Sequence, residues 1–368
     1  MKFSIKKMPA LVSMMAIAIF AITFTSCSDD DDPVAEVTYT YGFSRMSASH
    51  PDFLAEMNKI ESAFKSALGI TGKPFTKKGT VEECDLQVYE ACLKAFALLK
   101  GEVWQGDYIF QVTNVGTENI VYKAIFRAEN ENRPPVGNKA MKDADTGDFY
   151  FYDGTFADKS TELTTDQKYA CIGVVLKKGC DRSGDWADNG EYTFKESSTP
   201  MEVHGYVLAL TNTNGSYNTK GSCTWGVPWS NIAVGCDQNC TTGFNGYSNT
   251  LAIQNAANEH GWSLKREFPA AFDVVNYENL VCYAPPKTSG WFLPSAGQCQ
   301  YWLNNLEIID QNMREAGGDS CMGRYWSSSE AADQPVSDVY CMNSYPGYKK
   351  IYTDWKISLN KVRLCLAY

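Results

Sequence analysis

The chain has 368 residues, of which 44% are apolar and 21% are charged, a balance that is typical of a globular protein and excludes a disordered one. Its length favours two domains over a single core. The net charge is −10, and a negative protein lacks the basic surface that phosphate contacts need, which argues against nucleic acid as a partner.

The first 26 residues predict a targeting segment. A start with three lysines precedes an apolar run over residues 10–24, which is too short for a comfortable membrane span. The small residues Thr25 and Ser26 then precede Cys27, and this arrangement resembles the lipobox of bacterial lipoproteins. The resemblance implies that Cys27 becomes the lipid-carrying N-terminus. The alternative is an ordinary secretory signal peptide.

An acidic tether is expected over residues 27–37. Ser28 and the four aspartates after it resemble the export signal of Bacteroidota-type surface lipoproteins. The resemblance implies a lipid-anchored protein on the outer face of the outer membrane, held there by its acyl chains alone. A plain solvated tether is the simpler interpretation of the same run.

Residues 38–128 predict a small α+β domain, in which two helices pack on one face of a short antiparallel sheet. Apolar residues recur every three or four positions in the helices, and alternate with polar ones in the first strand. The expected elements are a strand over 38–44, helices over 52–68 and 81–100, and a hairpin of strands over 107–114 and 120–127. A polar segment with two prolines, residues 129–138, marks the domain boundary.

Residues 139–368 predict a second α+β domain with long loops. Strands are expected over 148–154, 169–177 and 202–210, and the segment 254–277 is expected to carry a helix. Between them, residues 211–250 hold seven Asn and seven Thr without a helical period. Loops of that length are uncommon in compact domains and are often functional.

The last eighty residues predict a strand, a helix and two more strands. Trp291 and Leu293 form a short buried strand before Pro294, and Ser295 with Gln298 fits a helix capping box. A strand begins at Tyr325-Trp326, and a closing strand covers 362–368.

An ordered set of motifs in residues 145–368 resembles a family of bacterial surface-protein domains with a C-type-lectin-like fold. Such domains occur at the ends of bacterial collagen-like adhesins and in many Bacteroidota-type lipoproteins. The motifs are Asp153-Gly154, Ile172–Val175, His204–Val207, Asn249-Thr250, Gly290–Ser295, Tyr325–Glu330 and Val362-Arg363. The resemblance implies that the last strand returns to the core beside early strands.

Twelve cysteines follow Cys27, and an even number in an exported chain predicts disulfides. Cys84 and Cys92 cannot pair with each other, because eight residues of helix separate them by about 12 Å; they are candidates for buried free thiols. The Cys236–Cys240 pair has no second Cys or His pair beside it, so no metal site is expected there. No cofactor is predicted.

Two functions that occur on this type of fold, calcium-dependent sugar binding and oxidase activity, do not fit the residues of this chain. Gln334-Pro335-Val336 resembles the calcium-binding triplet of C-type lectins but lacks its final acid. Gly290–Pro294 resembles a run in formylglycine-generating oxidases, yet the surroundings of Cys341 and Cys365 do not match their paired active cysteines. We therefore expect a non-enzymatic protein.

The sequence favours a binding or adhesion module for a glycan or protein ligand outside the cell. The expected contact residues are aromatic side chains on the Asn/Thr-rich loops and the strand after them: Trp225, Trp229, Tyr247 and Trp326. The competing interpretation buries these rings beneath their own loops. The alternative function is a structural or assembly subunit of a surface appendage.

Overall fold

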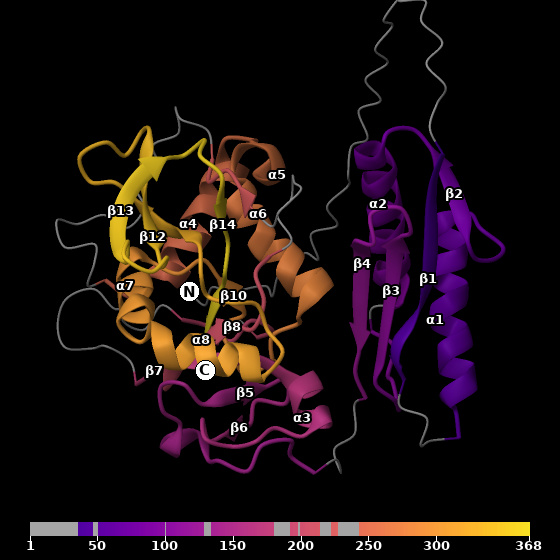
Figure 1. The fold of residues 1–368 in the computed structure, drawn as a ribbon, viewed down its shortest axis with the longest axis horizontal. Coiled ribbons are helices and arrows are strands. Elements are labelled where there is room, and N and C mark those ends of the chain that lie inside the picture. Colours follow the sequence, from indigo (N-terminus) through magenta and orange to yellow (C-terminus); the bar gives the residue numbers. More distant parts are fainter. Residues whose placement is uncertain are drawn as a thin grey trace, which may run out of the picture.

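The computed structural model describes residues 36–46, 51–99, 101–128, 134–179, 192–197, 199–213, 222–226 and 243–368. The predicted signal segment and lipidation site Cys27 lie outside these ranges. The described part is an α+β structure of helices and mainly antiparallel sheets, as predicted. Residues 36–128 form an N-terminal lobe and residues 134–368 a C-terminal lobe, side by side (Figure 1). No helix within these ranges is long and apolar enough to cross a membrane.

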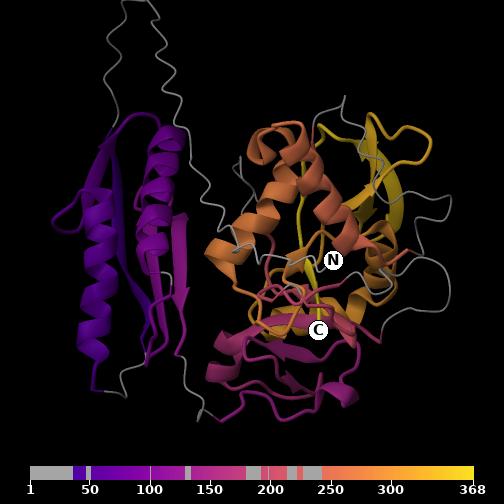
Figure 2. The same ribbon diagram turned by 180° about the vertical axis from the view of Figure 1, so that it is seen from behind.

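The N-terminal lobe packs two helices on one antiparallel sheet of order β2-β1-β3-β4. In chain order its elements are β1 (Glu36–Met46), α1 (Phe53–Leu68), β2 (Phe75–Lys78), α2 (Val81–Leu99), β3 (Tyr108–Asn114) and β4 (Ile120–Phe126). Both helices cover the same face of the sheet (Figure 2), so the predicted arrangement is confirmed. The sequence did not predict β2, because a strand of four residues carries too short a pattern.

Alternate residues of the strands point into the core of this lobe. Phe64 of α1 stacks on Phe110 of β3, with ring centroids 4.3 Å apart. Cys84 and Cys92 are buried free thiols in the same core, as predicted. The first helix ends at Gly69, whose φ of 68° is left-handed and suits glycine.

The first sheet of the C-terminal lobe has the order β10-β15-β8-β7-β5-β6. Its strands are β5 (Phe149–Phe151), β6 (Phe156–Ala157), β7 (Cys171–Lys178), β8 (Gly205–Ala209), β10 (Trp291–Phe292) and β15 (Cys365–Ala367). The predicted return of the last strand is confirmed, because β15 lies between β10 and β8. The ring of Tyr368 then packs against Tyr150 and Phe156, at the beginning of this lobe.

The second sheet of this lobe has the order β13-β12-β11-β14-β9. Its strands are β9 (Ser222–Cys223), β11 (Arg324–Glu330), β12 (Asp338–Asn343), β13 (Lys350–Trp355) and β14 (Asn360–Lys361). Strands β12 and β13 form a hairpin in which Asp338 pairs with Trp355 and Asn343 with Lys350. Strand β13 therefore forms one edge of the sheet.

Helices pack around these sheets. They are α3 (Thr165–Ala170), α4 (Gly246–Glu259), α5 (Leu264–Glu267), α6 (Pro269–Asn276), α7 (Ala296–Asn304) and α8 (Leu306–Glu315), with short helical turns at η1 (Met141–Asp143) and η2 (Tyr277–Val281). The segment 254–277, predicted to carry a helix, holds three helical segments, the end of α4 followed by α5 and α6. Gly261, with a φ of 66°, ends the first helical segment, and Pro269 begins the third.

The capping box before α7 is confirmed. The Ser295 hydroxyl accepts a hydrogen bond from the Gln298 N–H at 3.2 Å, and the Gln298 side chain accepts one from the Ser295 N–H at 2.8 Å. The helix then breaks at Asn305, where α8 begins at a new angle (Figure 1).

The nine described cysteines are all buried and free: Cys84, Cys92, Cys171, Cys223, Cys282, Cys299, Cys321, Cys341 and Cys365. The prediction of disulfides is therefore wrong for these nine. They behave as small core residues, and their number alone does not show that they are close enough to pair. Cys180, Cys236 and Cys240 lie outside the described residues.

The two lobes meet where the N-terminal core approaches η2 and the strand β5. Val281 of η2 packs against the core of the N-terminal lobe. The Arg127 guanidinium lies 3.8 Å from the centre of the Tyr152 ring, which is a close cation–π contact across the junction.

Candidate functional site

The aromatic residues predicted to contact a ligand are buried where the structure describes them. Trp225 is 1% exposed, Trp326 is fully buried and Tyr247 is 8% exposed. Trp229 lies outside the described residues. The prediction that Trp225, Tyr247 and Trp326 form an exposed contact surface is therefore wrong.

Hydrogen bonds inside the protein explain why these large rings are buried. The Trp225 indole N–H donates to the Ser327 carbonyl at 2.9 Å, and the Trp326 indole N–H donates to the Cys223 carbonyl at 2.7 Å. Tyr247 stacks on Tyr192 with ring centroids 4.6 Å apart. An internal hydrogen bond offsets the cost of desolvating the polar atom of such a ring.

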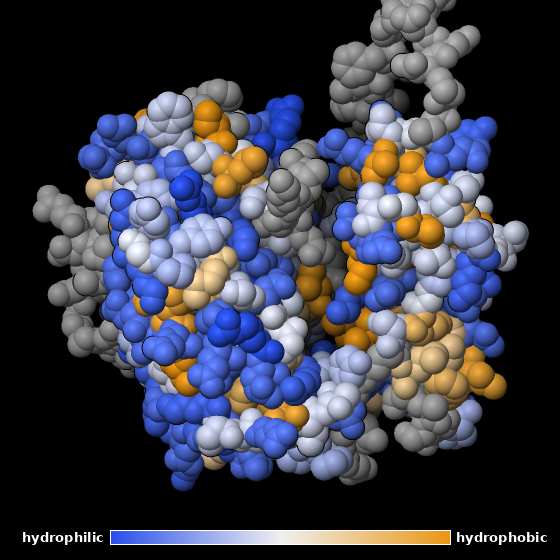
Figure 3. Space-filling view, in the orientation of Figure 1, coloured by the Kyte–Doolittle hydropathy of each residue, from blue (hydrophilic) through white to orange (hydrophobic). Residues whose placement is uncertain are grey.

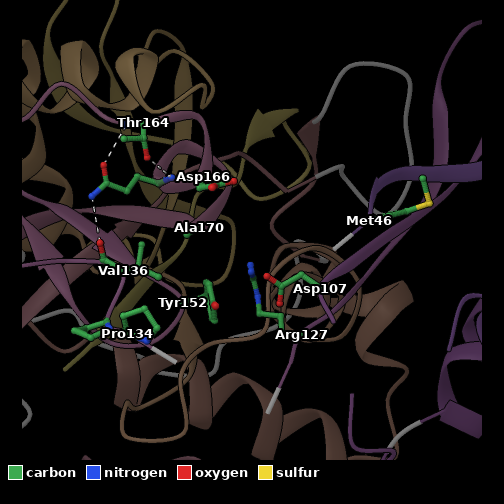
Figure 4. A pocket seen from close by; sticks show the side chains of 11 residues that line it. Met46, Asp107, Arg127, Pro134, Val136, Tyr152, Thr164, Asp166 and Ala170 are labelled. Carbon is green, nitrogen blue, oxygen red and sulfur yellow. Dashed lines mark hydrogen bonds between the residues drawn. The ribbon is translucent and has the colours of Figure 1, made fainter. Parts of the chain in front are cut away.

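A pocket of about 540 Å³ lies at the junction of the lobes, and Figure 4 shows Asp107 and Arg127 facing Tyr152 across it. Polar side chains that line this pocket form hydrogen bonds with neighbouring residues of the protein. The Gln167 side chain donates to the Val136 carbonyl at 3.2 Å and forms a capping box with Thr164. Asp107 accepts a hydrogen bond from the Ala128 N–H at 3.0 Å. We therefore regard the pocket as part of the contact between the lobes.

The surface with the clearest functional character lies on two neighbouring turns at the base of the β12–β13 hairpin. Four apolar side chains are exposed there, Val336 on one turn and Trp355, Ile357 and Leu359 on the other, by 47%, 64%, 52% and 60%. We call these four residues the turn surface. On the face shown in Figure 3, hydrophobic side chains are scattered among hydrophilic ones or gather where the lobes meet.

A buried lysine ties the two turns together. Lys356 is fully buried and forms an ion pair with Glu330, at 2.5 Å and itself buried. Its ammonium also donates to the Pro335 carbonyl at 2.7 Å, and its backbone N–H donates to the Ser337 carbonyl at 2.9 Å. The ammonium lies 4.8 Å from the centre of the Trp225 ring. The predicted contact residue Trp225 is thus part of the support beneath the turn surface.

Asp354 holds the second turn from its other end. One oxygen of its carboxylate accepts hydrogen bonds from the Trp355 N–H at 2.9 Å and the Ser358 hydroxyl at 2.8 Å. The other oxygen accepts from the Asn360 side chain at 3.1 Å. Side chains along this turn alternate, so that Lys356 and Asn360 point inward while the apolar residues between them point to solvent.

This arrangement is suited to contact with another molecule. The turn surface combines aliphatic side chains with an exposed tryptophan, a residue type that is enriched in binding hot spots. Among the described residues, no group of three or more His, Cys, Asp or Glu side chains is placed to hold a metal ion.

Cys341 and Cys365, the cysteines compared with an oxidase pair, lie in different sheets and are fully buried. Burial raises the pKa of both thiols well above the ordinary value. A reactive cysteine needs the opposite environment, one that lowers the thiol pKa.

The turn surface could not be identified from the amino-acid sequence. Residues 354–359 alternate between polar and apolar types, which resembles the end of a strand, and no sequence pattern indicates that Lys356 is the buried residue.

Comparisons with known proteins give no family for this chain, because no family model matches it and no curated protein is significantly similar to it.

Proposed function

We propose that the protein is a lipid-anchored, surface-exposed lipoprotein of the outer membrane that acts as a non-catalytic binding or adhesion module for an extracellular ligand. The turn surface carries this proposal, because it presents four exposed apolar side chains on turns that are fixed from beneath. Sequence analysis allowed a glycan or a protein ligand. The aliphatic neighbours of Trp355 favour a protein, since sugar platforms pair an aromatic ring with polar side chains.

The C-terminal lobe is proposed to be a C-type-lectin-like domain, and contacts among the motif residues support this. The Ser328 N–H donates to the Pro294 carbonyl at 2.8 Å, and the Asn249 side chain donates to the Ser328 hydroxyl at 3.1 Å. Three separate motifs therefore meet in space. The closing strand β15 also brings the end of the lobe beside its beginning.

Ligand binding is expected to be independent of calcium. The turn that contains Gln334-Pro335-Val336 is already tied to a cation, because the Lys356 ammonium contacts both the Pro335 carbonyl and the Glu330 carboxylate. A divalent ion at that place would face a buried positive charge.

The test is a binding screen with the chain lacking residues 1–27, against labelled mucin, a panel of glycans and extracellular proteins. The matched variants are Leu359→Ala on the turn surface and Leu98→Ala on α2, whose side chain is 73% exposed in the other lobe. We expect Leu359→Ala to weaken binding about tenfold, which corresponds to about 1.4 kcal/mol, and Leu98→Ala and EDTA to change nothing. Equal binding by both variants would rule out the turn surface.

The alternative is a structural or assembly subunit of a surface appendage. One observation favours it: β13 is an exposed edge strand beside the turn surface. Absence of ligand binding together with co-purification in a filament would support this function instead.

A further inference from the structure

Strand β13 is the longest edge strand of the sheets described in the C-terminal lobe. The other edge strands of the sheets described in the C-terminal lobe, β6, β9 and β10, have two residues each. Strand β13 has six. Natural sheets commonly shorten their exposed edges to prevent pairing, so a long edge requires an explanation.

The register of the hairpin shows which backbone groups of β13 point away from the sheet. The Lys356 N–H donates to the Ser337 carbonyl, next to the pair of Trp355 with Asp338. Bonded and non-bonded pairs alternate in an antiparallel ladder, so Ile351, Thr353 and Trp355 direct their backbone groups outward. The Trp355 N–H and carbonyl are used by Asp354 and Ser358. Within the described part of the chain, the outward groups of Ile351 and Thr353 are left to pair.

The geometry points to a second copy of this chain as the occupant of this edge, bound by antiparallel pairing of β13 with β13 about Tyr352. In this register Ile351 of each copy pairs with Thr353 of the other, so that all the outward N–H and carbonyl groups of these two residues are bonded. If the pairing were centred on Thr353 instead of Tyr352, Ile351 would stand opposite Trp355. The backbone groups of Trp355 already form hydrogen bonds within their own copy.

The charged side chains of β13 favour the same register, with the pairing centred on Tyr352. Lys350 stands at one end of β13 and Asp354 at the other, on the same face of the sheet. Antiparallel pairing about Tyr352 places Lys350 of each copy opposite Asp354 of the other, and Lys349 beside the exposed ring of Trp355. Opposite charges at facing positions stabilise a strand pair, whereas parallel pairing would bring the lysines together.

Exposed rings lie at both ends of the strand. Tyr345 and Tyr348, at the tip of the hairpin, are 47% and 69% exposed. In the antiparallel pair the tip of one copy faces the base of the other, where Ile357 is exposed. The pairing therefore places the tip tyrosines of each copy beside exposed apolar side chains at the base of the other.

The inference does not depend on a ligand of the turn surface, because the pairing uses the backbone of Ile351 and Thr353. It is tested by sedimentation equilibrium of the chain lacking residues 1–27, over a wide concentration range. In the dimer, Lys350→Glu places a negative charge opposite Asp354 at each of the two symmetry-related positions. Thr353→Pro removes an outward N–H that bonds nothing within the described part of the chain. The control Lys94→Glu makes the same charge change on an exposed position of α2.

We expect a concentration-dependent dimer for the unaltered chain and for Lys94→Glu. Lys350→Glu should weaken dimerisation by about tenfold, and Thr353→Pro should abolish it. Thermal unfolding and circular dichroism identify a variant that has failed to fold, and exchange of the Ile351 and Thr353 amides should slow as concentration rises. A monomer at all concentrations, open-ended oligomers, or unchanged dimerisation of both β13 variants would overturn the inference. Leu359→Ala tests ligand binding separately.

Discussion

Trp225 and Trp355 are neighbours of the same lysine but lie in opposite environments. Trp225 packs beneath the Lys356 ammonium and is 1% exposed, whereas Trp355 precedes Lys356 in the chain and is 64% exposed. The Trp225 indole N–H bonds a carbonyl inside the protein. A polar sequence around a tryptophan therefore does not indicate an exposed ring, since an internal partner for its N–H lowers the cost of burying it.

The buried ion pair of Lys356 and Glu330, beneath the turn surface, has a high desolvation cost. Moving both Lys356 and Glu330 out of water costs several kcal/mol, which their attraction only partly offsets, so such a pair is weak evidence for stability. The ion pair does, however, fix the position of both turns. We infer that the pair serves the geometry of the turn surface, because the same lysine also bonds the Pro335 and Ser337 carbonyls.

The largest expected effect comes from removing the lysine side chain. Lys356→Ala leaves Glu330 buried without its cation and removes the contact over Trp225. We expect the free energy of unfolding to fall by about 3–5 kcal/mol, measured by urea denaturation.

The matched variant replaces both members of the pair by apolar residues, Lys356→Met with Glu330→Leu. It should recover most of the stability, since no unpaired charge is left in the core. If the single variant were as stable as the unaltered chain, the ion pair would be solvated in solution and the proposed support would be absent.

The second prediction compares the two tryptophans by the same substitution. Trp225→Phe leaves the Ser327 carbonyl without its donor and opens space in the core, so unfolding should become easier by about 1–3 kcal/mol. Trp355→Phe should change stability by no more than about 0.5 kcal/mol, as is usual for a surface position. Equal losses of unfolding free energy in the two variants would show that Trp225 and Trp355 do not differ in burial as described.

The sequence predicted the N-terminal lobe better than the site. Both of its helices bury one face, so the spacing of residues such as Ile60 and Phe64 suffices to predict them. The capping box at Ser295 is similarly local. The burial of Trp225 and Lys356 depends on partners about a hundred and about twenty-six positions away, Ser327 and Glu330, which no local pattern reveals.

The third prediction concerns the carboxylate that holds the exposed turn. Asp354→Asn replaces an oxygen that accepts the Asn360 amide by a group that donates, or else disturbs the bonds from Trp355 and Ser358. We expect a loss of about 1 kcal/mol in the free energy of unfolding, because the site is partly solvated. Amide exchange at Ser358 should become faster, and unchanged exchange would show that Asp354 does not order the turn.

The smallest effect on stability is expected at the tip of the turn itself. Leu359→Ser removes an apolar side chain that is 60% exposed, so folding gains little from it and the free energy of unfolding should change by no more than about 0.5 kcal/mol. Leu303→Ser, a substitution of a leucine that is 8% exposed on α7, provides the contrast and should cost several times more. The two urea transitions measure this difference directly. A leucine that contributes almost nothing to stability but is required for binding is the signature of a contact surface, whereas a large stability loss at Leu359 would place this side chain in the core and remove it from the turn surface.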